Sequence, residues 1–157
     1  MILTSVVLPI DEAGRRVPLG QKRRGFGQGK LVGIGGKVEP GEDLAAAAAR
    51  ELCEEVGLLA DASQMQPAAR LLFRFPASPH WDFQMVVFVV WAWQGEPMLS
   101  DEIEPQWHGL DALPLERMWD DARLWLPPVL AGQWVTATFF YDADRKTVVQ
   151  AVFGGRL

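Results

Sequence analysis

The chain has 157 residues, of which 49% are hydrophobic and 22% are charged, and its formal net charge is −5. This length suits one domain with a sizeable core and is too short for two ordinary domains, so we expect a single domain over residues 1–157. The composition argues against a disordered chain, and the acidic balance argues against a protein that binds the backbone of a nucleic-acid polymer.

Cysteine usage and the absence of targeting signals indicate a cytoplasmic protein. The single cysteine, Cys53, cannot form an internal disulfide. The segment from Met1 to Pro9 lacks a basic lead and a small-residue cleavage site, so it is predicted to be a strand rather than a signal peptide. The longest apolar run, from Met85 to Trp93, falls well short of the ~20 residues that a membrane-spanning helix needs. We therefore expect no membrane contact.

The first part of the chain is predicted to form strands. Leu3 to Leu8 is rich in β-branched and aliphatic residues, and a turn over Asp11 to Gly14 leads into a second strand over Val17 to Lys22. The segment from Lys22 to Lys30 combines four cations with three glycines, which suits either phosphate binding or a solvated loop. A short strand over Leu31 to Ile34 is expected next.

A long helix is predicted from Asp43 to Val56. Asp43 is a suitable N-cap, five consecutive alanines give the segment a very high helix propensity, and Gly57 is a suitable C-cap. The apolar positions of the helix, such as Leu52, are expected on a face turned away from its glutamates.

The second half of the chain predicts the remaining strands and a second helix. Ala69 to Phe75 and Phe83 to Trp93 have the composition of strands, and the latter is apolar on both faces, which favours a central position in a covered sheet. Ser100 to Pro105 is an acidic loop. The last expected elements are a strand over Gln106 to Gly109, a turn of helix within Leu110 to Met118, a helix over Leu124 to Ala131 with Pro127 and Pro128 near its start, and a hairpin of Val135 to Tyr141 with Thr147 to Phe153.

Three carboxylates crowd the end of the predicted long helix. Glu51, Glu54 and Glu55 stand at positions i, i+3 and i+4, near the negative pole of the helix dipole, where each carboxylate is disfavoured by roughly 0.3–1 kcal/mol. Arg50 is the nearby cation. A solvated acidic face is one explanation, but it leaves the glycines of segment 33–36 unexplained. A glycine loop beside several carboxylates suits a hard divalent cation such as magnesium.

The same stretch resembles a known sequence motif. Gly36, five residues, Glu42, seven residues and then the segment Arg50 to Leu58 match the Nudix box at every defined position. The chain is therefore identified as a member of the Nudix hydrolases, with the box at residues 36–58. This resemblance implies an α/β (α+β) fold, namely an α/β/α sandwich with a mixed β-sheet between helices.

The resemblance also implies roles for the residues of the box. The implied ligands of Mg²⁺, or of Mn²⁺ as the alternative metal, are Glu51, Glu54, Glu55 and the backbone carbonyl of Gly35. Glu51 or a neighbouring carboxylate would act as the catalytic base. Arg50 would hold the glutamates by charge-assisted hydrogen bonds. Glu102 is a further candidate ligand, with a solvated side chain as the alternative.

Over nearly its whole length the chain is similar to the 8-oxo-dGTP diphosphatase branch of the family, the MutT-like enzymes that remove oxidised purine nucleotides. Segments 19–20, 24–27, 35–38, 100–102 and 118–125 carry this similarity. It implies a nucleotide pocket lined by Thr4, Lys22, Phe26, Gly36, Lys37, Phe73, Trp119, Asp121 and Trp125. Trp119 would stack on a purine, an interaction worth roughly 1–3 kcal/mol.

Two positions depart from the pattern of this branch. Val32 stands where the branch has an asparagine that reads the purine edge, and Ala122 replaces the second of two aspartates. A small backbone shift would let Asp120 substitute for the missing aspartate. Because sites that select by buried hydrogen bonds lose selectivity when a partner is missing, a broader or altered base preference is expected.

These observations predict a monomeric, metal-dependent enzyme that hydrolyses nucleoside triphosphates to nucleoside monophosphate and pyrophosphate, favouring oxidised purines such as 8-oxo-dGTP. The alternatives within enzymes are a general (d)NTP diphosphatase and a hydrolase of dinucleoside polyphosphates or nucleotide sugars. A nucleotide sensor without turnover is the alternative from another class, although a pure binder has no evident need for the full set of glutamates.

Overall fold

A mixed six-stranded sheet forms the centre of the computed structural model, which describes residues 1–154. Its strands are, in spatial order, β4 (Ile34–Lys37), β1 (Ile2–Pro9), β6 (Phe83–Val90), β5 (Gln66–Arg74), β8 (Val135–Tyr141) and β9 (Val148–Phe153). β1 runs parallel to β6 and β5 parallel to β8, and the other neighbours are antiparallel. A three-stranded sheet packs beside it, with β2 (Arg16–Lys22) between β3 (Leu31–Val32) and β7 (Ile103–Gly109).

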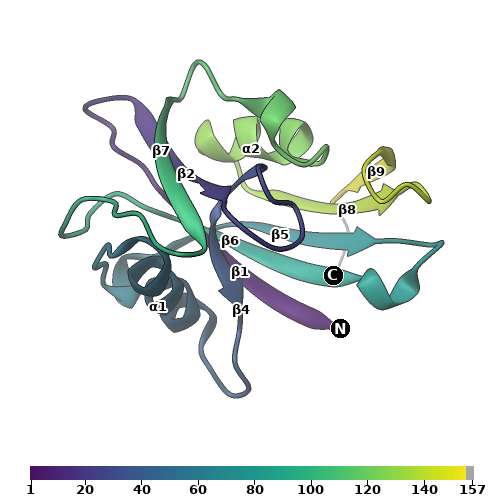
Figure 1. Cartoon of the computed structure of the whole chain (residues 1–157), viewed down its shortest axis with the longest axis horizontal. Coiled ribbons are helices and arrows are strands. Elements are labelled where there is room, and N and C mark those ends of the chain that lie inside the picture. Colours follow the sequence, from purple (N-terminus) through teal and green to yellow (C-terminus); the bar gives the residue numbers. More distant parts are fainter. Residues whose placement is uncertain (155–157) are drawn as a thin grey trace.

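The two helices, α1 (Leu44–Val56) and α2 (Ala122–Leu130), lie on opposite sides of the large sheet (Figure 1). The side chains of β6 show this division, because Val87 belongs to the core under α2 whereas Val86 and Phe88 belong to the core under α1. The predicted α/β/α sandwich and the central position of this strand are therefore confirmed.

Both ends of α1 are fixed by the residues that the sequence indicated. The Asp43 carboxylate accepts a hydrogen bond from the Ala46 N–H over 3.2 Å, and Gly57 ends the helix at φ 73°, a left-handed conformation that glycine adopts without strain. Ala48 and Leu52 are fully buried against the sheet. The small alanine side chains thus let the helix lie close to the strands.

The fold departs from the sequence-based expectation in several places. The strands form two sheets rather than one, and β7 begins at Ile103 because Ile103 and Glu104 pair with Lys22 and Gln21 of β2. β6 ends at Val90, before the predicted boundary.

A further departure concerns the two prolines of α2, which lie in the second half of the helix rather than near its start. Proline removes a backbone donor within a helix. We attribute the tolerance of this loss to packing, because Trp125, Leu126 and Val129 are buried against the sheet.

The remaining regular elements are short. They are the 3₁₀ turns η1 (Ala62–Gln64), η2 (Pro79–Trp81) and η3 (Leu115–Arg117), the last of which lies within the segment where a helical turn was predicted. Among residues 1–154, no helix is both long enough and apolar enough to cross a membrane.

Candidate active site

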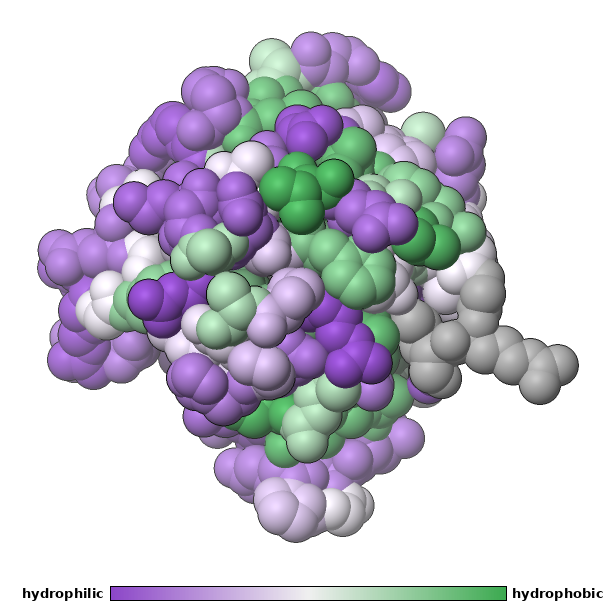
Figure 2. Space-filling view, turned by 90° about the vertical axis from the view of Figure 1, so that its right-hand side faces the viewer, coloured by the Kyte–Doolittle hydropathy of each residue, from purple (hydrophilic) through white to green (hydrophobic). Residues whose placement is uncertain are grey.

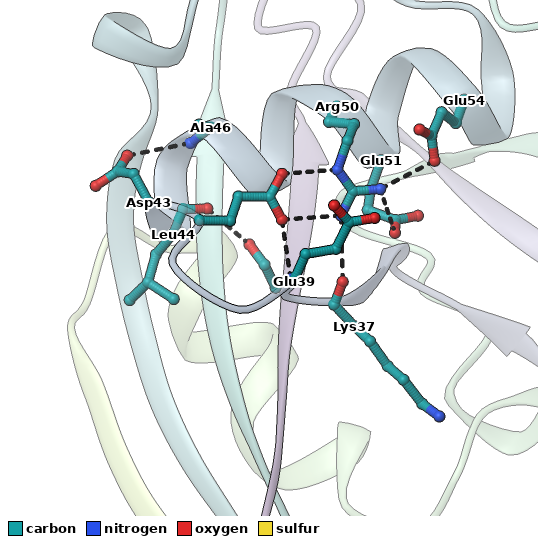
Figure 3. Close-up of polar contacts among 10 residues, drawn as sticks. Lys37, Glu39, Asp43, Leu44, Ala46, Arg50, Glu51 and Glu54 are labelled. Atoms are coloured by element: carbon teal, nitrogen blue, oxygen red, sulfur yellow. Dashed lines mark hydrogen bonds and ion pairs between the residues drawn. The ribbon is translucent and has the colours of Figure 1, made fainter.

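Arg50 is the centre of a partly buried ionic network beside α1 (Figure 3). Its guanidinium donates to Glu42 Oε2 over 2.7 Å and to Glu42 Oε1 over 3.0 Å. It also reaches Glu51 Oε1 at 3.1 Å, Glu54 Oε2 at 3.0 Å and the Lys37 carbonyl oxygen at 3.2 Å. Arg50 therefore ties the loop before α1 to two of the three glutamates near the helix end, as expected of a residue that orients ligands.

Glu51 is the most buried of the three glutamates, with 8% of its surface exposed. It lies against Gly36, where a Cβ atom would come within 2.5 Å of a Glu51 carboxylate oxygen. The absence of a side chain at Gly36 thus makes room for this carboxylate. Burial raises the pKa of Glu51, and the neighbouring Arg50 opposes that shift. Glu51 is part of the buried surface of α1, so the core and the glutamates are not separated as cleanly as the sequence suggested.

Glu55 carries a buried oxygen that needs a partner. Its Oε2 atom has no hydrogen-bond partner among residues 1–154. Burial raises the pKa of Glu55, and the nearby carboxylates of Glu51, Glu102 and Glu54 raise it further. A buried carboxylate without a partner is costly. A bound cation would satisfy it.

The donor set fits a divalent metal ion, although the side chains are not arranged as a closed metal site. Within the described part of the chain, no three His, Cys, Asp or Glu side chains form a ready metal-binding cluster. Arg50 engages Glu51 and Glu54 instead. The unpartnered Glu55 oxygen, the adjacent Glu51 carboxylate and the nearby backbone of Gly35 are oxygen ligands of the kind that Mg²⁺ and Mn²⁺ prefer.

A cavity of about 410 Å³ opens beside Glu55, whereas Glu51 and Glu54 are not part of its lining. Its lining includes most of the residues expected at the site, namely Thr4, Lys22, Phe26, Gly35, Gly36, Glu55, Phe73, Glu102, Trp119 and Asp121. They come from both sheets, from α1 and from the loops between β2 and β3 and before α2. The fold thus brings together residues that are far apart in the sequence.

Aromatic side chains form part of the cavity wall. Phe26 stacks on Trp119 with ring centroids 5.1 Å apart and meets Trp81 edge-on at 4.9 Å. Phe26 is 59% exposed, and the Lys30 ammonium lies 5.1 Å from the centroid of the Trp119 ring. The space-filling view onto the right-hand side of Figure 1 shows hydrophobic side chains exposed among hydrophilic ones (Figure 2). Such rings suit a planar, apolar ligand group.

The basic loop between β2 and β3 is tied to the acidic loop before β7. Arg24 forms an ion pair with Glu102, and Arg23 donates to the Ser100 carbonyl oxygen over 2.6 Å. Arg24 lowers the pKa of Glu102 through this contact. Lys22, at the end of β2, and Glu102, in the acidic loop, both line the cavity, while the Arg24–Glu102 ion pair is largely exposed.

Three residues expected in the pocket lie outside the cavity lining. Lys37 is exposed on β4, and its side chain extends away from the Arg50 network (Figure 3). Trp125 lies on the buried face of α2, with 4% of its surface exposed. Asp120 is held elsewhere, because its Oδ1 accepts from Arg123 over 2.9 Å and its Oδ2 accepts from the Val148 N–H over 2.8 Å. In this structure Asp120 therefore does not face the cavity.

Asp121 is the buried carboxyl group of the cavity, with 7% of its surface exposed. Trp125 Nε1 donates to Asp121 Oδ2 over 2.7 Å, and the Tyr141 hydroxyl donates to Oδ1. Burial raises the pKa of Asp121, while these two donors act in the opposite direction. Trp125 thus positions Asp121 rather than facing the cavity itself.

Several lining residues were not predicted from the sequence. They are Val6, Gly33, Phe75, Trp81, Phe83, Met85, Ile103, Tyr141 and Arg145, whereas Val32 lines the cavity as its position in the branch pattern implied. Tyr141 was accessible to sequence reasoning, because alternation along β8 places it on the same buried face as Ala137 and Phe139. The proximity of Arg145 to Trp81, 4.4 Å from the ring centroid, depends on a loop and has no such signal.

The α/β/α sandwich thus places an acidic helix end beside an aromatic cavity, an arrangement of the kind found in enzyme active sites. A NUDIX domain model matches residues 2–129, and the chain therefore belongs to the Nudix hydrolase family. Members of this family generally need a divalent metal ion.

Curated relatives lie within this family. The chain is 43% identical over 128 residues to an oxidized purine nucleoside triphosphate hydrolase of Danio rerio, covering 82% of this chain and 79% of the relative. It is 38% identical over 131 residues to the protein of the same name from Mus musculus, covering 83% of this chain and 82% of the relative.

A solved structure shows the same fold. The crystal structure of a MutT protein from Bacillus halodurans superposes with a TM-score of 0.81 at 21% identity, over 98% of this chain and 97% of the other. At this level of identity, the likeness establishes the fold alone.

Proposed function

We propose that the protein hydrolyses nucleoside triphosphates to nucleoside monophosphate and pyrophosphate, and that it favours oxidised purine nucleotides such as 8-oxo-dGTP. The names of the two vertebrate relatives support this substrate class. Mg²⁺ is the proposed metal ion, with Mn²⁺ as an effective substitute. We further propose that the protein has a single domain, is located in the cytoplasm and is a monomer.

One observation carries the proposal: the same cavity contains the unpartnered carboxylate of Glu55 and the aromatic wall of Phe26 and Trp119. The first suits metal-bound phosphate groups and the second suits a purine ring. A divalent ion bound there would screen the phosphate charge and lower the pKa of a water molecule.

The residues of the chain would divide the remaining tasks. Glu51, Glu54 and Glu55, with the Gly35 carbonyl, would hold the metal, and a carboxylate of this group would accept the proton of the attacking water. Glu102 would add a ligand, and Lys22 would attract the triphosphate through its charge. Arg50 would fix Glu51 and Glu54 in place through the contacts already described.

The stacking of Phe26 on Trp119 suggests how the base would bind. The Gly25–Gly29 loop that carries Phe26 has three glycines at positive φ, and Phe26 itself is largely exposed. A purine would take the place of the Phe26 ring on Trp119 or extend the stack. Trp119 would then supply stacking energy of similar size for different purines, so it would contribute little to base selection.

The proposal is tested by measuring product formation from a panel of nucleoside triphosphates in Mg²⁺, with products separated by ion-exchange chromatography. We expect 8-oxo-dGTP to yield 8-oxo-dGMP and pyrophosphate, with a kcat/KM above that of dGTP. Turnover of 8-oxo-dGTP no faster than that of dGTP would remove the preference for oxidised purines. Nucleotide binding without metal-dependent turnover would identify a sensor instead.

A further inference from the structure

The aromatic part of the cavity has few polar groups with which to read a base. Val32 and Ala122 stand where the related branch has polar side chains, and Asp120 is bound to Arg123 and β9. The buried polar side chains that remain in the lining of this part are Asp121 and Tyr141. Tyr141 belongs to β8 and lies outside the family motif, so neither the motif nor the comparisons assign it a role.

The hydrogen bonds of Tyr141 decide which way its hydroxyl group can act. The hydroxyl donates its proton to Asp121 Oδ1 and accepts from the Asp121 N–H over 3.3 Å. Since the single hydroxyl proton is committed to Asp121, the oxygen can offer only a lone pair to a ligand. Asp121 accepts from protein donors at both oxygens and keeps further lone pairs. The two side chains therefore present neighbouring acceptors.

The tyrosine ring is held firmly in this position. It is 4% exposed, and it stacks on Phe75 with ring centroids 5.0 Å apart and an interplanar angle of 18°. Its strand pairs with both β5 and β9. A group fixed by packing and hydrogen bonds on a strand is well suited to discriminate between ligands, because little ordering is needed when the ligand binds.

We propose that the Tyr141 hydroxyl, positioned by Asp121, is a specificity-determining group that selects purines with a 6-oxo-2-amino edge over purines with a 6-amino edge. This inference rests on the proposed function. A guanine-type edge offers two adjacent donors, N1–H and the 2-amino group, which match two neighbouring acceptors. An adenine-type edge offers one donor beside the unprotonated N1, whose lone pair opposes an acceptor.

The test compares two substrates that share the oxidised imidazole ring and differ in the edge of the six-membered ring that carries N1. The ratio of kcat/KM for 8-oxo-dGTP to that for 8-oxo-dATP is measured at pH 8.5, which favours the ionised form of Asp121. We expect the wild type to prefer 8-oxo-dGTP at least ~10-fold, and Tyr141→Phe to reduce this ratio ~10-fold, as for the loss of one buried hydrogen bond.

Thr138→Val is the matched control, because it also removes one hydroxyl from β8 but on the opposite face of the strand. We expect it to leave the ratio unchanged. A Tyr141→Phe protein that unfolds cooperatively and keeps the wild-type ratio would overturn the inference. So would a ratio near one in the wild type.

A binding measurement tests this inference independently of the proposed catalytic function. Calorimetric titration with 8-oxo-dGMP and 8-oxo-dAMP in the absence of metal reports edge selection without turnover. A wild type that hydrolyses neither triphosphate would refute the proposed function, whereas preferential binding of 8-oxo-dGMP that is lost in Tyr141→Phe would still support the role of Tyr141. Should that variant fail to fold, a complex of the wild type with 8-oxo-dGMP decides, since a Tyr141 oxygen more than ~4 Å from every base atom excludes the contact.

Discussion

Arg50 and Glu42 form a two-bonded ion pair, with Nε donating to Oε2 over 2.7 Å and Nη2 donating to Oε1 over 3.0 Å. Arg50 lowers the pKa of Glu42, as expected for a carboxylate that accepts two charge-assisted bonds. The pair joins the loop before α1 to the last turns of the helix. Because the other guanidinium nitrogen reaches Glu51 and Glu54, the geometry of this pair sets the position of two proposed metal ligands.

We predict that Arg50→Lys lowers kcat about 10- to 100-fold and weakens metal binding by a similar factor. A lysine keeps the charge but offers a single ammonium in place of the planar fork, so it cannot serve Glu42, Glu51 and Glu54 together. The measurement is the Mg²⁺ dependence of turnover. Arg117→Lys, at an exposed position in η3, is the control and should behave as wild type. Equal kinetics for the two variants would contradict the positioning role of Arg50.

Glu55→Gln should abolish turnover, by at least ~10³-fold, without loss of stability in the metal-free protein. The reason is that Glu55 Oε2 is buried and unpartnered, so the carboxylate is costly in the folded state unless a cation binds. Urea unfolding in EDTA checks stability and pyrophosphate release checks activity. Full activity in this variant, together with full activity in Glu54→Gln, would exclude the proposed metal ligands.

Metal binding should stabilise the wild type. At a free Mg²⁺ concentration of 100 times its Kd, binding adds about 2.7 kcal/mol to the free energy of unfolding. For a chain of this size, such a change raises Tm by roughly 5–10 °C. Thermal unfolding with and without Mg²⁺ measures the shift, which Glu55→Gln should largely remove. An equal shift in wild type and variant would place the binding elsewhere on the protein.

The helix and its glutamates could be predicted from the sequence because residues close together in the chain determine them. Asp43, the alanines and Gly57 define where α1 begins and ends, and the spacing of Glu51, Glu54 and Glu55 then fixes their positions along it. The resemblance to a known motif added roles to residues that were already placed on one helix.

The base-binding part was harder to predict because long-range contacts build it. Trp125 and Asp120 lie on or beside α2, and only the packing of α2 and β9 shows that neither faces the cavity. Tyr141 comes from β8, whose position beside Asp121 depends on the order of the strands. Alternation along β8 predicts that Tyr141 is buried, but the spacing of residues in the sequence does not predict that Tyr141 contacts Asp121.

Trp119→Ala should raise KM for purine nucleotides about 10- to 100-fold, with a smaller effect on kcat. This range corresponds to the ~1–3 kcal/mol of a base stacked on an aromatic ring. Steady-state kinetics with 8-oxo-dGTP provide the measurement. Trp134→Ala removes another tryptophan, one that is 54% exposed and lies outside the cavity lining, and should leave KM unaltered. A wild-type KM in Trp119→Ala would show that the base binds away from this ring.

The pH dependence of stability should reveal the burial of Asp121. Burial raises the pKa of Asp121 above its ordinary value, so its contribution to stability is fully present below the ordinary pKa and is lost as pH rises through the higher pKa of the folded state. The asparagine of Asp121→Asn does not titrate, so the stability of this variant lacks the contribution of Asp121 to the pH dependence. We therefore expect the wild type to exceed Asp121→Asn in stability most strongly near pH 4, and the difference to shrink towards pH 8.

Urea unfolding of both proteins at several pH values measures this difference, and the other titrating groups cancel because the two proteins share them. Tyr141 and Trp125 act against the effect of burial, since their hydrogen bonds favour the ionised carboxylate. A difference that grows as pH rises would mean that these two donors outweigh burial and hold Asp121 ionised throughout. A difference that shrinks would show that the carboxyl group takes up a proton in the folded protein at mildly acidic pH.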